Sequence, residues 1–412
     1  MLAPGALEGV RVLDLSRLLP GGFCSLLLAD AGADVIKVED TGMGDYVRWS
    51  PPYYGGDEQQ GLGTRSALYL SLNRGKRSIR LNLKADGGRD ALLKLAEGAD
   101  VVLESFRPGV LDRLGCGYEA LRERNQRIIY CAITGYGQSG PNTARAGHDT
   151  NYLALGGLLG LSGPAGGPPI QAAGQIADLG GGALMAAFGI LAALWERERS
   201  GEGQFVDVSM TDGAQSWLAM AAASFLADGR VPRRGEEALN GGIACYVPYE
   251  CADGWVSVGA LEPKFWQAFC DGVERPDLVG HQFAKPGSEG HARIAEVFLA
   301  RTKKEWAAFN DQHDCCIEPV LDLDEALDSQ LTREREMVVD VEQPQIGTVR
   351  LLGMPLKFSR TPGDATRPAP ALGEHTAEVL GEAGIEGAEL DALLASGAAA
   401  GLSEDATGAF LS

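Results

Sequence analysis

The sequence predicts an α/β protein built around a mostly parallel β-sheet, and three observations support this fold class. Strand-like and helix-like segments alternate through the first 135 residues, which is typical of parallel strands with covering helices. The length of 412 residues exceeds that of one typical domain and indicates two lobes. Hydrophobic residues make up 45% of the chain and charged residues 22%, so the chain can bury a sizeable core.

Each element of the predicted sheet rests on a local pattern. Short apolar runs predict buried strands, at 10–15, 34–39, 78–83, 100–104 and 127–134. Helical patterns lie between them, at 23–31, 88–97 and 118–124.

Two stretches interrupt this alternation. Pro20, Gly21 and Gly22 predict a turn ahead of the first helix. The segment 48–71 is rich in Gly, Tyr and polar residues, so we expect an excursion from the sheet, either a flap or an interface loop.

The second half of the chain has a different pattern. Residues 148–226 are helical and Gly-rich, with a strand-like stretch at 204–209. Residues 246–259 alternate around an Asp253-Gly254 turn and predict an antiparallel pair, and a strand-like stretch follows at 316–321. The tail from Gly373 is helical, and its Ala- and Gly-rich part at 397–408 is expected to be mobile.

The overall charge excludes several classes of partner. The formal net charge is -20, which argues against broad electrostatic binding to nucleic acid or to an anionic membrane. The apolar stretch 176–195 contains Asp178 and three glycines, which predicts a helix buried in protein rather than a membrane span. Eight cysteines without a C-x-x-C pair indicate reduced thiols, and no signal peptide is recognised, so we expect a cytoplasmic protein.

A histidine stands at the start of a predicted helix. In Gly147-His148-Asp149-Thr150, Gly147 breaks the chain and Asp149 or Thr150 can cap a helix. His148 would then lie beside backbone N–H groups that can hold an enolate oxygen, and histidine is a natural general base near neutral pH. The alternative is a capping turn with an incidental histidine.

Two acids also precede helices. Asp178 stands just before Gly180-Gly181-Gly182, and Glu262 ends a strand just before Pro263. A helix-start acid is the ordinary interpretation of each, and an acid facing a site is the alternative. The Gly135–Gly140 loop matches G-x-G-x-x-G but runs on into loop residues, which indicates a turn where backbone can approach a ligand rather than an NAD site.

Together these segments resemble the family III CoA-transferase (CaiB/BaiF) superfamily and, within it, the alpha-methylacyl-CoA racemases. The matches run in order along nearly the whole chain. They include Pro20-Gly21-Gly22-Phe23-Cys24, Asn73-Arg74-Gly75-Lys76-Arg77-Ser78, Glu104-Ser105-Phe106-Arg107-Pro108-Gly109-Val110, the Gly135–Gly140 loop, Gly147-His148-Asp149-Thr150-Asn151-Tyr152 and Gly373-Glu374-His375-Thr376.

The resemblance implies an architecture and a partner. It implies a Rossmann-like large CoA-binding domain at 1–225, a smaller α+β domain at 226–340, and a C-terminal segment at 341–412 that returns to the large domain. It also implies an interlocked homodimer that acts on acyl-CoA thioesters, with no metal or redox cofactor beyond the CoA of the substrate.

The resemblance assigns catalytic roles to four residues. His148 and Asp178 would exchange the α-proton on opposite faces of a 2-methylacyl-CoA, and Glu262 would orient His148. The backbone N–H of Asp149 would stabilise the enolate oxygen.

It also assigns CoA contacts, which fall in three groups. The loop after the third strand would lie near the nucleotide, two arginines would face the phosphates, and the stretch after the glycine loop would follow the pantetheine. The residues are Leu81, Asn82 and Lys84; Arg107 and Arg113; and Gly147, Asn151 and Tyr152.

Two alternatives remain open. Family III CoA-transferases use an aspartate at the position of Asp178 as a nucleophile and commonly carry Tyr at the position of His148. The excursion at 48–71 is similar to theirs, and Asp40 stands where animal racemases tend to carry a CoA-contacting Arg. The second alternative is a CoA-binding protein without activity, against which the intact His148, Asp178 and Glu262 argue.

Overall fold

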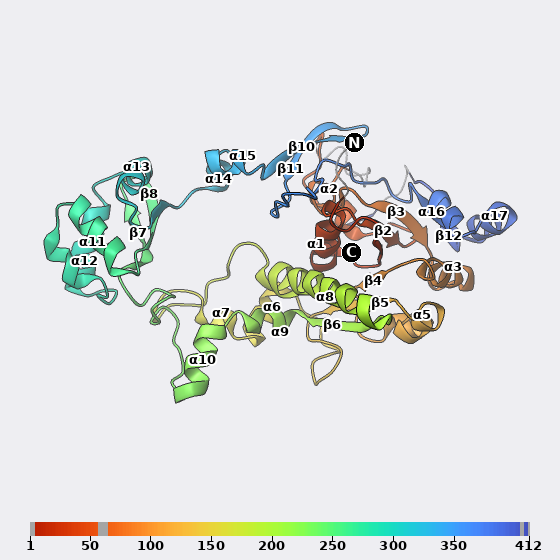
Figure 1. Cartoon of the computed structure of the whole chain (residues 1–412), viewed down its shortest axis with the longest axis horizontal. Coiled ribbons are helices and arrows are strands. Elements are labelled where there is room, and N and C mark those ends of the chain that lie inside the picture. The colour runs from red at the N-terminus through yellow and green to blue at the C-terminus, as the bar shows by residue number, and fades with distance from the viewer. Residues whose placement is uncertain (1–4, 57–64, 404–407, 411–412) are drawn as a thin grey trace. The chain divides into compact units, whose positions relative to one another are not determined.

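The computed structural model describes residues 5–56, 65–403 and 408–410, which form two compact units (Figure 1). Unit 1 comprises Met1–Tyr152, Gly174–Ala214 and Gln330–Ser412, and unit 2 comprises Leu153–Ala173 and Gln215–Ser329. Residues 153–173 and 215–225 therefore belong to unit 2, and residues 330–340 belong to unit 1.

Unit 1 is built on a seven-stranded sheet with the order β12-β3-β2-β1-β4-β5-β6. Strands β1 to β6 are mutually parallel, and β12 joins β3 in the antiparallel direction. The strands are β1 (Arg11–Asp14), β2 (Asp34–Glu39), β3 (Arg77–Leu81), β4 (Val101–Glu104), β5 (Ile129–Thr134), β6 (Phe205–Ser209) and β12 (Ala399–Ala400). The predicted α/β class with a parallel sheet is confirmed.

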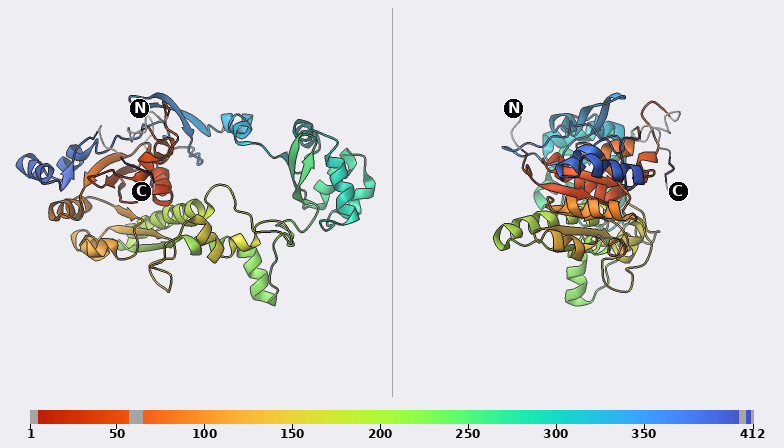
Figure 2. Two further views of the ribbon diagram at one scale, coloured as in Figure 1. Left: turned by 180° about the vertical axis from the view of Figure 1, so that it is seen from behind. Right: turned by 90° about the vertical axis from the view of Figure 1, so that its right-hand side faces the viewer.

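Helices cover both faces of this sheet (Figures 1 and 2). Helices α1 and α8 pack on one face, and α3, α5 and α16 share a hydrophobic core with the other. The helical segments before β6 are α1 (Leu18–Asp30), η1 (Tyr46–Trp49), α2 (Ala67–Asn73), α3 (Asp86–Ala96), α4 (Val110–Arg113), α5 (Tyr118–Arg124), α6 (Asp149–Leu155), the π-helix η3 (Ile176–Leu184) and α8 (Met185–Ser200). After β6 comes α9 (Met210–Ser216), which begins in unit 1 and ends in unit 2, and the later helices of unit 1 are α15 (Gln330–Glu334), α16 (Thr376–Glu382) and α17 (Gly387–Ser396).

The first helix begins earlier than predicted. Pro20, Gly21 and Gly22 lie inside α1 and do not form a turn before it, so that prediction was wrong. Proline is tolerated in a first helical turn, where its missing N–H would have no partner. A Cβ on Gly21 would lie 2.1 Å from the Cβ of Ser16, so glycine serves close packing here.

The predicted excursion is anchored by buried charges. The guanidinium of Arg48 lies 2.6 Å from Glu39 of β2, and both side chains are buried. It also stacks on the Tyr69 ring of α2, with its central carbon 3.8 Å from the ring centroid. Residues 57–64 of the excursion lie outside the described residues.

The C-terminal part of the chain packs into unit 1. A hairpin of β10 (Val338–Gln343) and β11 (Gly347–Leu352) forms a separate two-stranded sheet. Ala399 pairs with Leu81 and Ala400 with Arg80, so this part of the segment expected to be mobile forms the edge strand β12. Residues 404–407 of that segment lie outside the described residues.

Unit 2 has its own core around a small antiparallel sheet. Strands β7 (Tyr246–Cys251) and β8 (Gly254–Gly259) pair across the predicted Asp253-Gly254 turn, and β9 (Ile317–Pro319) joins β8. The helical segments of unit 2 are α7 (Leu158–Leu161), α10 (Ala219–Asp228), α11 (Pro263–Gly272), η4 (Pro276–His281), α12 (Glu289–Phe298), α13 (Lys303–His313) and α14 (Leu323–Leu327).

Among the residues that the structure describes, one continuous helical segment is long and apolar enough to cross a membrane by length and composition. It is Ile176–Ser200, which joins η3 to α8, and half of its most apolar window is buried. Helix α8 contacts β5 and β6, as a core helix of an α/β unit does.

Candidate active site

His148 stands immediately before α6, as the sequence predicted, with its side chain exposed. Its backbone N–H donates to Oδ1 of Asn151 at 3.0 Å, so the asparagine fixes the start of the helix. Its Nδ1 lies 2.6 Å from the carbonyl oxygen of Gly147. A carbonyl oxygen can only accept, so Nδ1 carries a hydrogen, and in the neutral ring Nε2 is the nitrogen with the free lone pair. The imidazole is thus held in a tautomer in which Nε2 can act as a base.

The carboxylate of Asp149 ties α6 to η3. Its Oδ1 accepts the backbone N–H of Ala177 at 2.7 Å and that of Asp178 at 3.0 Å. Asp149 is buried, and its Oδ2 has no hydrogen-bond partner among the described residues. The side chain of Asp149 therefore fixes the backbone of Asp178 next to His148, and the aspartate contributes more than the backbone N–H that the sequence assigned to it.

Asp178 lies in the first turn of η3 and has a perturbed acidity. Burial, and after it the nearby charge of Asp149, raise the pKa of Asp178 from its ordinary value of 3.8 to about 6. A positive charge on His148 acts in the opposite direction, so the two catalytic candidates lie within electrostatic reach of one another. The structure brings His148, Asp149 and Asp178 together in unit 1.

Two tyrosines support this cluster. The hydroxyl of Tyr152 donates to the same Gly147 carbonyl oxygen that faces His148. Its ring packs edge-on against Tyr136, with the centroids 5.3 Å apart. Burial raises the pKa of Tyr152 to about 12, so it remains a neutral donor at physiological pH. A Cβ on Gly147 would lie 2.7 Å from the Tyr152 ring, so this turn requires glycine for close packing.

The order of the strands in the sheet reverses between β1 and β4. From β1 the chain proceeds to β2 and β3 on one side, and from β4 it proceeds to β5 and β6 on the other. In open α/β sheets, ligands bind where the strand order reverses in this way. The loops that flank this point contain Arg17, after β1, and Ser105 and Phe106, after β4; the N–H of Arg17 donates to Oγ of Ser105 at 3.1 Å.

The predicted nucleotide contacts lie on loops at the same edge. Asn82 and Lys84 follow β3, and the backbone N–H of Lys84 donates to Oδ1 of Asn82 at 3.1 Å. Leu81 is buried in the core, so only its backbone can reach a ligand. Arg107 and Arg113 follow β4; both are exposed and form no ion pair within the described part of the chain.

Glu262 belongs to unit 2, so its contact with His148 stays a prediction. It is exposed and stands directly before α11, where Pro263 occupies the first turn as predicted. Its side chain accepts no capping hydrogen bond, so it is not engaged as a helix cap.

The glycine loop after β5 does not open a helix. Residues 135–148 form turns and extended backbone, and α6 begins only at Asp149. A dinucleotide fingerprint requires the helix to start within the glycine motif, so this geometry agrees with a ligand-approach turn rather than an NAD site.

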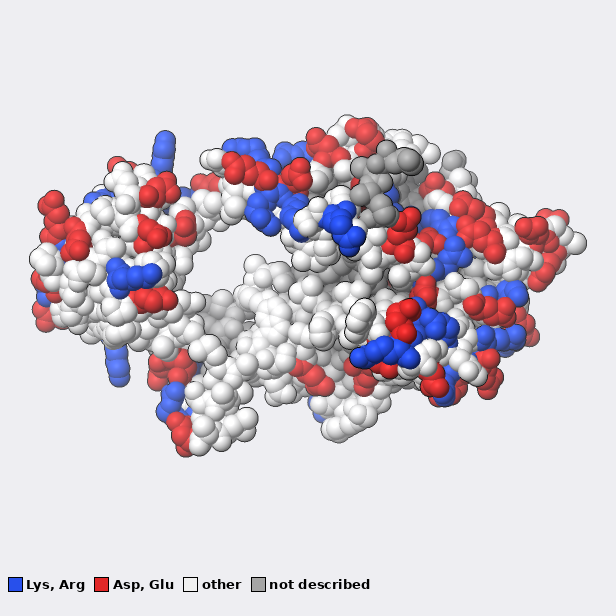
Figure 3. All heavy atoms as spheres, viewed as in Figure 1, with Lys and Arg blue, Asp and Glu red and all other residues white. Residues whose placement is uncertain are grey.

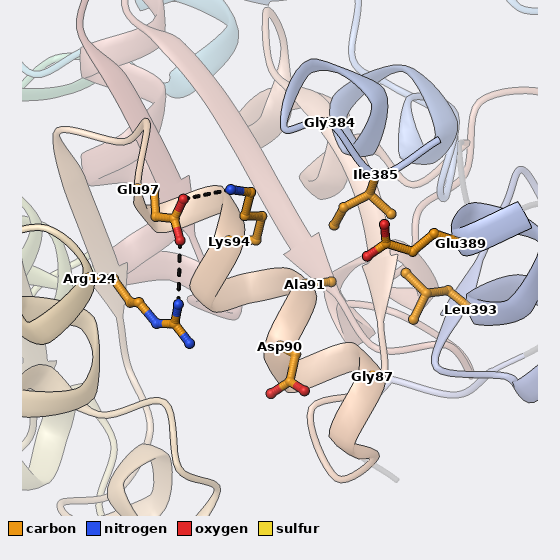
Figure 4. Close-up of a pocket in the computed structure, with 10 residues that line it drawn as sticks. All are labelled: Gly87, Asp90, Ala91, Lys94, Glu97, Arg124, Gly384, Ile385, Glu389 and Leu393. Carbon is orange, nitrogen blue, oxygen red and sulfur yellow. Dashed lines mark hydrogen bonds and ion pairs between the residues drawn. The ribbon is translucent and has the colours of Figure 1, made fainter. Parts of the chain in front are cut away.

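A separate pocket of about 320 Å³ lies between α3, α5 and the turn into α17 (Figure 4). Its floor is formed by apolar side chains from α3 and α17. On its rim Glu97 lies 2.8 Å from Lys94 and 3.6 Å from Arg124, so both basic side chains there are paired with an acid. None of the predicted site residues lines this pocket.

A model of CoA-transferase family III matches residues 7–376. The chain belongs to CoA-transferase family III. The crystal structure of a CaiB/BaiF family protein from Brucella suis superposes with a TM-score of 0.79 at 30% identity, covering 92% of this chain and 100% of that one. The family and the fold class expected from the sequence are confirmed.

Two family III relatives have different activities. The succinyl-CoA:mesaconate CoA-transferase of Haloarcula hispanica is 38% identical over 395 residues, covering 92% of this chain and 97% of that protein. The alpha-methylacyl-CoA racemase of Mus musculus is 39% identical over 393 residues, covering 93% of this chain and 95% of that protein. This family III protein is therefore an enzyme of the transferase and racemase superfamily, and similarity to these relatives does not select one reaction.

Sequence reasoning missed three features of the site. These are the Asp149 carboxylate as a link to η3, the Gly147 carbonyl that orients His148, and the position of Arg17 at the strand-order reversal. Only the last had a usable signal, because Arg17 follows the first predicted strand directly.

Proposed function

We propose that this chain is a 2-methylacyl-CoA racemase that exchanges the α-proton of the thioester between His148 and Asp178. The observation that carries the proposal is the pairing of these two groups. His148 has its Nδ1 committed to a carbonyl, and Asp178 has a pKa of about 6. A nucleophilic carboxylate needs no such histidine, whereas a two-base reaction needs both groups.

The proton balance of the reaction follows from these two groups. Neutral His148 takes the proton from C2, and the electrons of the C–H bond pass into the thioester carbonyl to give an enolate. Protonated Asp178 then donates its proton to the opposite face of C2, and the carbonyl re-forms. The enzyme is left with protonated His148 and ionised Asp178, which is the state required for the reverse direction.

A pKa of about 6 for Asp178 suits both directions. Asp178 can therefore hold its proton or release it near neutral pH. The backbone N–H of Asp149, at the start of α6, would stabilise the enolate oxygen, since helix N-termini favour negative charge. Glu262 would hydrogen-bond His148 from unit 2.

The proposal includes the CoA-binding surface, the oligomeric state and the cellular location of the enzyme. The nucleotide of CoA would bind at the carboxyl edge of the sheet, with Arg107 and Arg113 facing phosphate and residues 147–152 along the pantetheine. The reaction uses no metal or redox cofactor. The enzyme would act as a homodimer in the cytoplasm.

The proposal is tested by incubating one configuration of a 2-methylacyl-CoA in heavy water without an added acid. Deuterium should appear at C2 with loss of stereochemical purity. His148→Ala and Asp178→Asn should each slow this by about 10²–10⁴-fold, the usual contribution of a proton-transfer group. His313→Gln, which alters a histidine of unit 2 at the end of α13, is the matched control and should leave the rate unchanged.

The transferase alternative predicts a different outcome. CoA would then move to a supplied carboxylic acid through an acyl anhydride at Asp178, without deuterium at C2, and His148→Ala would retain activity. That result would overturn the racemase proposal.

A further inference from the structure

Arg17 and Asp40 form an exposed ion pair at the reversal of the strand order. The terminal nitrogen of Arg17 lies 2.9 Å from Oδ2 of Asp40, and each side chain is about 40% exposed. Arg17 follows β1 and Asp40 follows β2, so both lie at the carboxyl edge of the sheet. The central carbon of the guanidinium is 6.0 Å from the ring centroid of Phe106, which follows β4.

This pair differs from the other ion pairs around it. The pairs Arg48–Glu39 and Arg74–Asp30 are fully buried, as cross-links of the fold usually are. An exposed pair contributes only about 0–1 kcal/mol to stability, because water and ions screen it. The Arg17 guanidinium is therefore free to exchange its carboxylate partner for another anion.

The guanidinium still has donors to offer. Asp40 engages one nitrogen, and no other acceptor binds the guanidinium within the described part of the chain. Arginine carries five N–H donors in a planar fork that matches phosphate. The other carboxylate oxygen of Asp40 accepts the N–H groups of Gly42, at 2.8 Å, and Gly44, at 3.3 Å, so the acid is held by the β2 loop and does not follow the arginine.

We propose that Arg17 binds a nucleotide phosphate of CoA and that Asp40 is the counter-ion it releases on binding. The proposal rests on the proposed acyl-CoA substrate and adds a specificity-determining residue to it. In a protein with a net charge of -20, a phosphate site requires local positive charge. Arg17 supplies that charge from the loop after β1, and Arg107 supplies it from the loop after β4. Asp40 masks Arg17 while the site is empty, which disfavours weakly bound anions.

The test measures binding rather than turnover. CoA and pantetheine, which lacks the nucleotide, are titrated by calorimetry into the whole protein and its Arg17→Gln and Arg17→Lys variants. Arg17→Gln should weaken CoA binding by about ten-fold or more, as expected for a lost charge-assisted hydrogen bond. Arg17→Lys should show a smaller loss, and pantetheine binding should not change. The salt dependence of CoA binding should also become weaker in Arg17→Gln.

Arg127→Gln is the matched control. Arg127 is an exposed arginine in the turn before β5, at the opposite edge of the sheet, and its replacement by Gln changes the net charge by the same amount. It should leave CoA binding unchanged, and thermal unfolding should show that all variants are folded.

The outcomes separate this inference from the proposed function. If the unmodified protein binds CoA and Arg17→Gln binds it equally well, or loses CoA and pantetheine in equal measure, the role of Arg17 is overturned alone. If the unmodified protein does not bind CoA, the proposed function falls and the role of Arg17 falls with it.

Discussion

The raised pKa of Asp178 suits proton transfer but destabilises the folded protein at neutral pH. Its folded environment holds the pKa near 6, so the carboxyl can give and take a proton at neutral pH. Between pH 3.8 and 6 the folded protein retains a proton that the unfolded chain has lost. The contribution of Asp178 to the free energy of unfolding therefore falls as the pH rises through that window. Above pH 6 the ionised carboxylate destabilises the folded protein by roughly 3 kcal/mol at most.

Asp178→Asn should remove this destabilisation together with the activity. We expect the variant to be about 1–3 kcal/mol more stable than the parent at pH 8, because an amide is not ionised when it is buried. The difference should shrink as the pH falls toward 4. Urea unfolding at pH 8, 6 and 4.5 measures it.

Asp311→Asn, at an exposed aspartate of α13, is the control and should show no such pH dependence. Equal or lower stability of Asp178→Asn at pH 8 would show that the folded site does not disfavour the ionised carboxylate.

At the scale of elements, the position of Asp178 depends on the contact between η3 and α9. A Cβ on Gly213 of α9 would lie 2.1 Å from the carbonyl oxygen of Gly181 in η3. In turn, a Cβ on Gly181 would lie 2.7 Å from the carbonyl oxygen of Met210. These obstacles are backbone atoms, which a rotamer change cannot relieve. The π-helix that carries Asp178 is thus placed by glycine-to-backbone packing.

Gly213→Ala should therefore displace η3 and impair catalysis from outside the site. We expect a loss of about 1–3 kcal/mol in stability, typical of overpacking, and a fall in kcat larger than the fall in folded fraction. Gly98→Ala is the control, because a Cβ there meets no atom within 4 Å. Denaturant unfolding and proton-exchange rates measure both variants, and full activity in Gly213→Ala would contradict the role of this contact.

Sequence patterns predicted individual strands and helices but not the contacts between them. Strand β2 and helix α5 have the predicted bounds, because an apolar run and a helical period are local signals. The predicted start of α1 was wrong because Pro20, Gly21 and Gly22 are also compatible with a first helical turn, where a proline loses no hydrogen bond. The link from Asp149 to η3 joins residues 28 apart in the chain. His148 and Asp178 were singled out by their positions before helices and the resemblance assigned their roles, whereas the hydrogen bond of His148 and the burial of Asp178 required the structure.

At the scale of the whole molecule, the charged surface has an apolar exception. Acidic and basic side chains are interspersed over the visible face, whereas the surface over α10 carries little charge except near its end (Figure 3). Helix α8, with the last residue of η3, exposes a row of apolar side chains at helical spacing: Leu184, Phe188, Leu191 and Trp195. Phe188 is 72% exposed and Trp195 is 71% exposed. An apolar row of this kind on one helix face is typical of a surface that a partner covers.

The proposed homodimer would cover this row with a second copy of the chain. Homodimer interfaces are richer in apolar side chains than other protein surfaces, and buried aromatic residues dominate their energetics. Replacing both Phe188 and Trp195 by Glu should therefore convert a dimer into a monomer, because it would bury two unpaired charges. Light scattering coupled to size exclusion measures the mass. Glu198→Ala, on the charged part of the same helix, should leave the dimer intact. A parent protein that is already monomeric, or a dimer that survives both glutamates, would show that this row is not the interface.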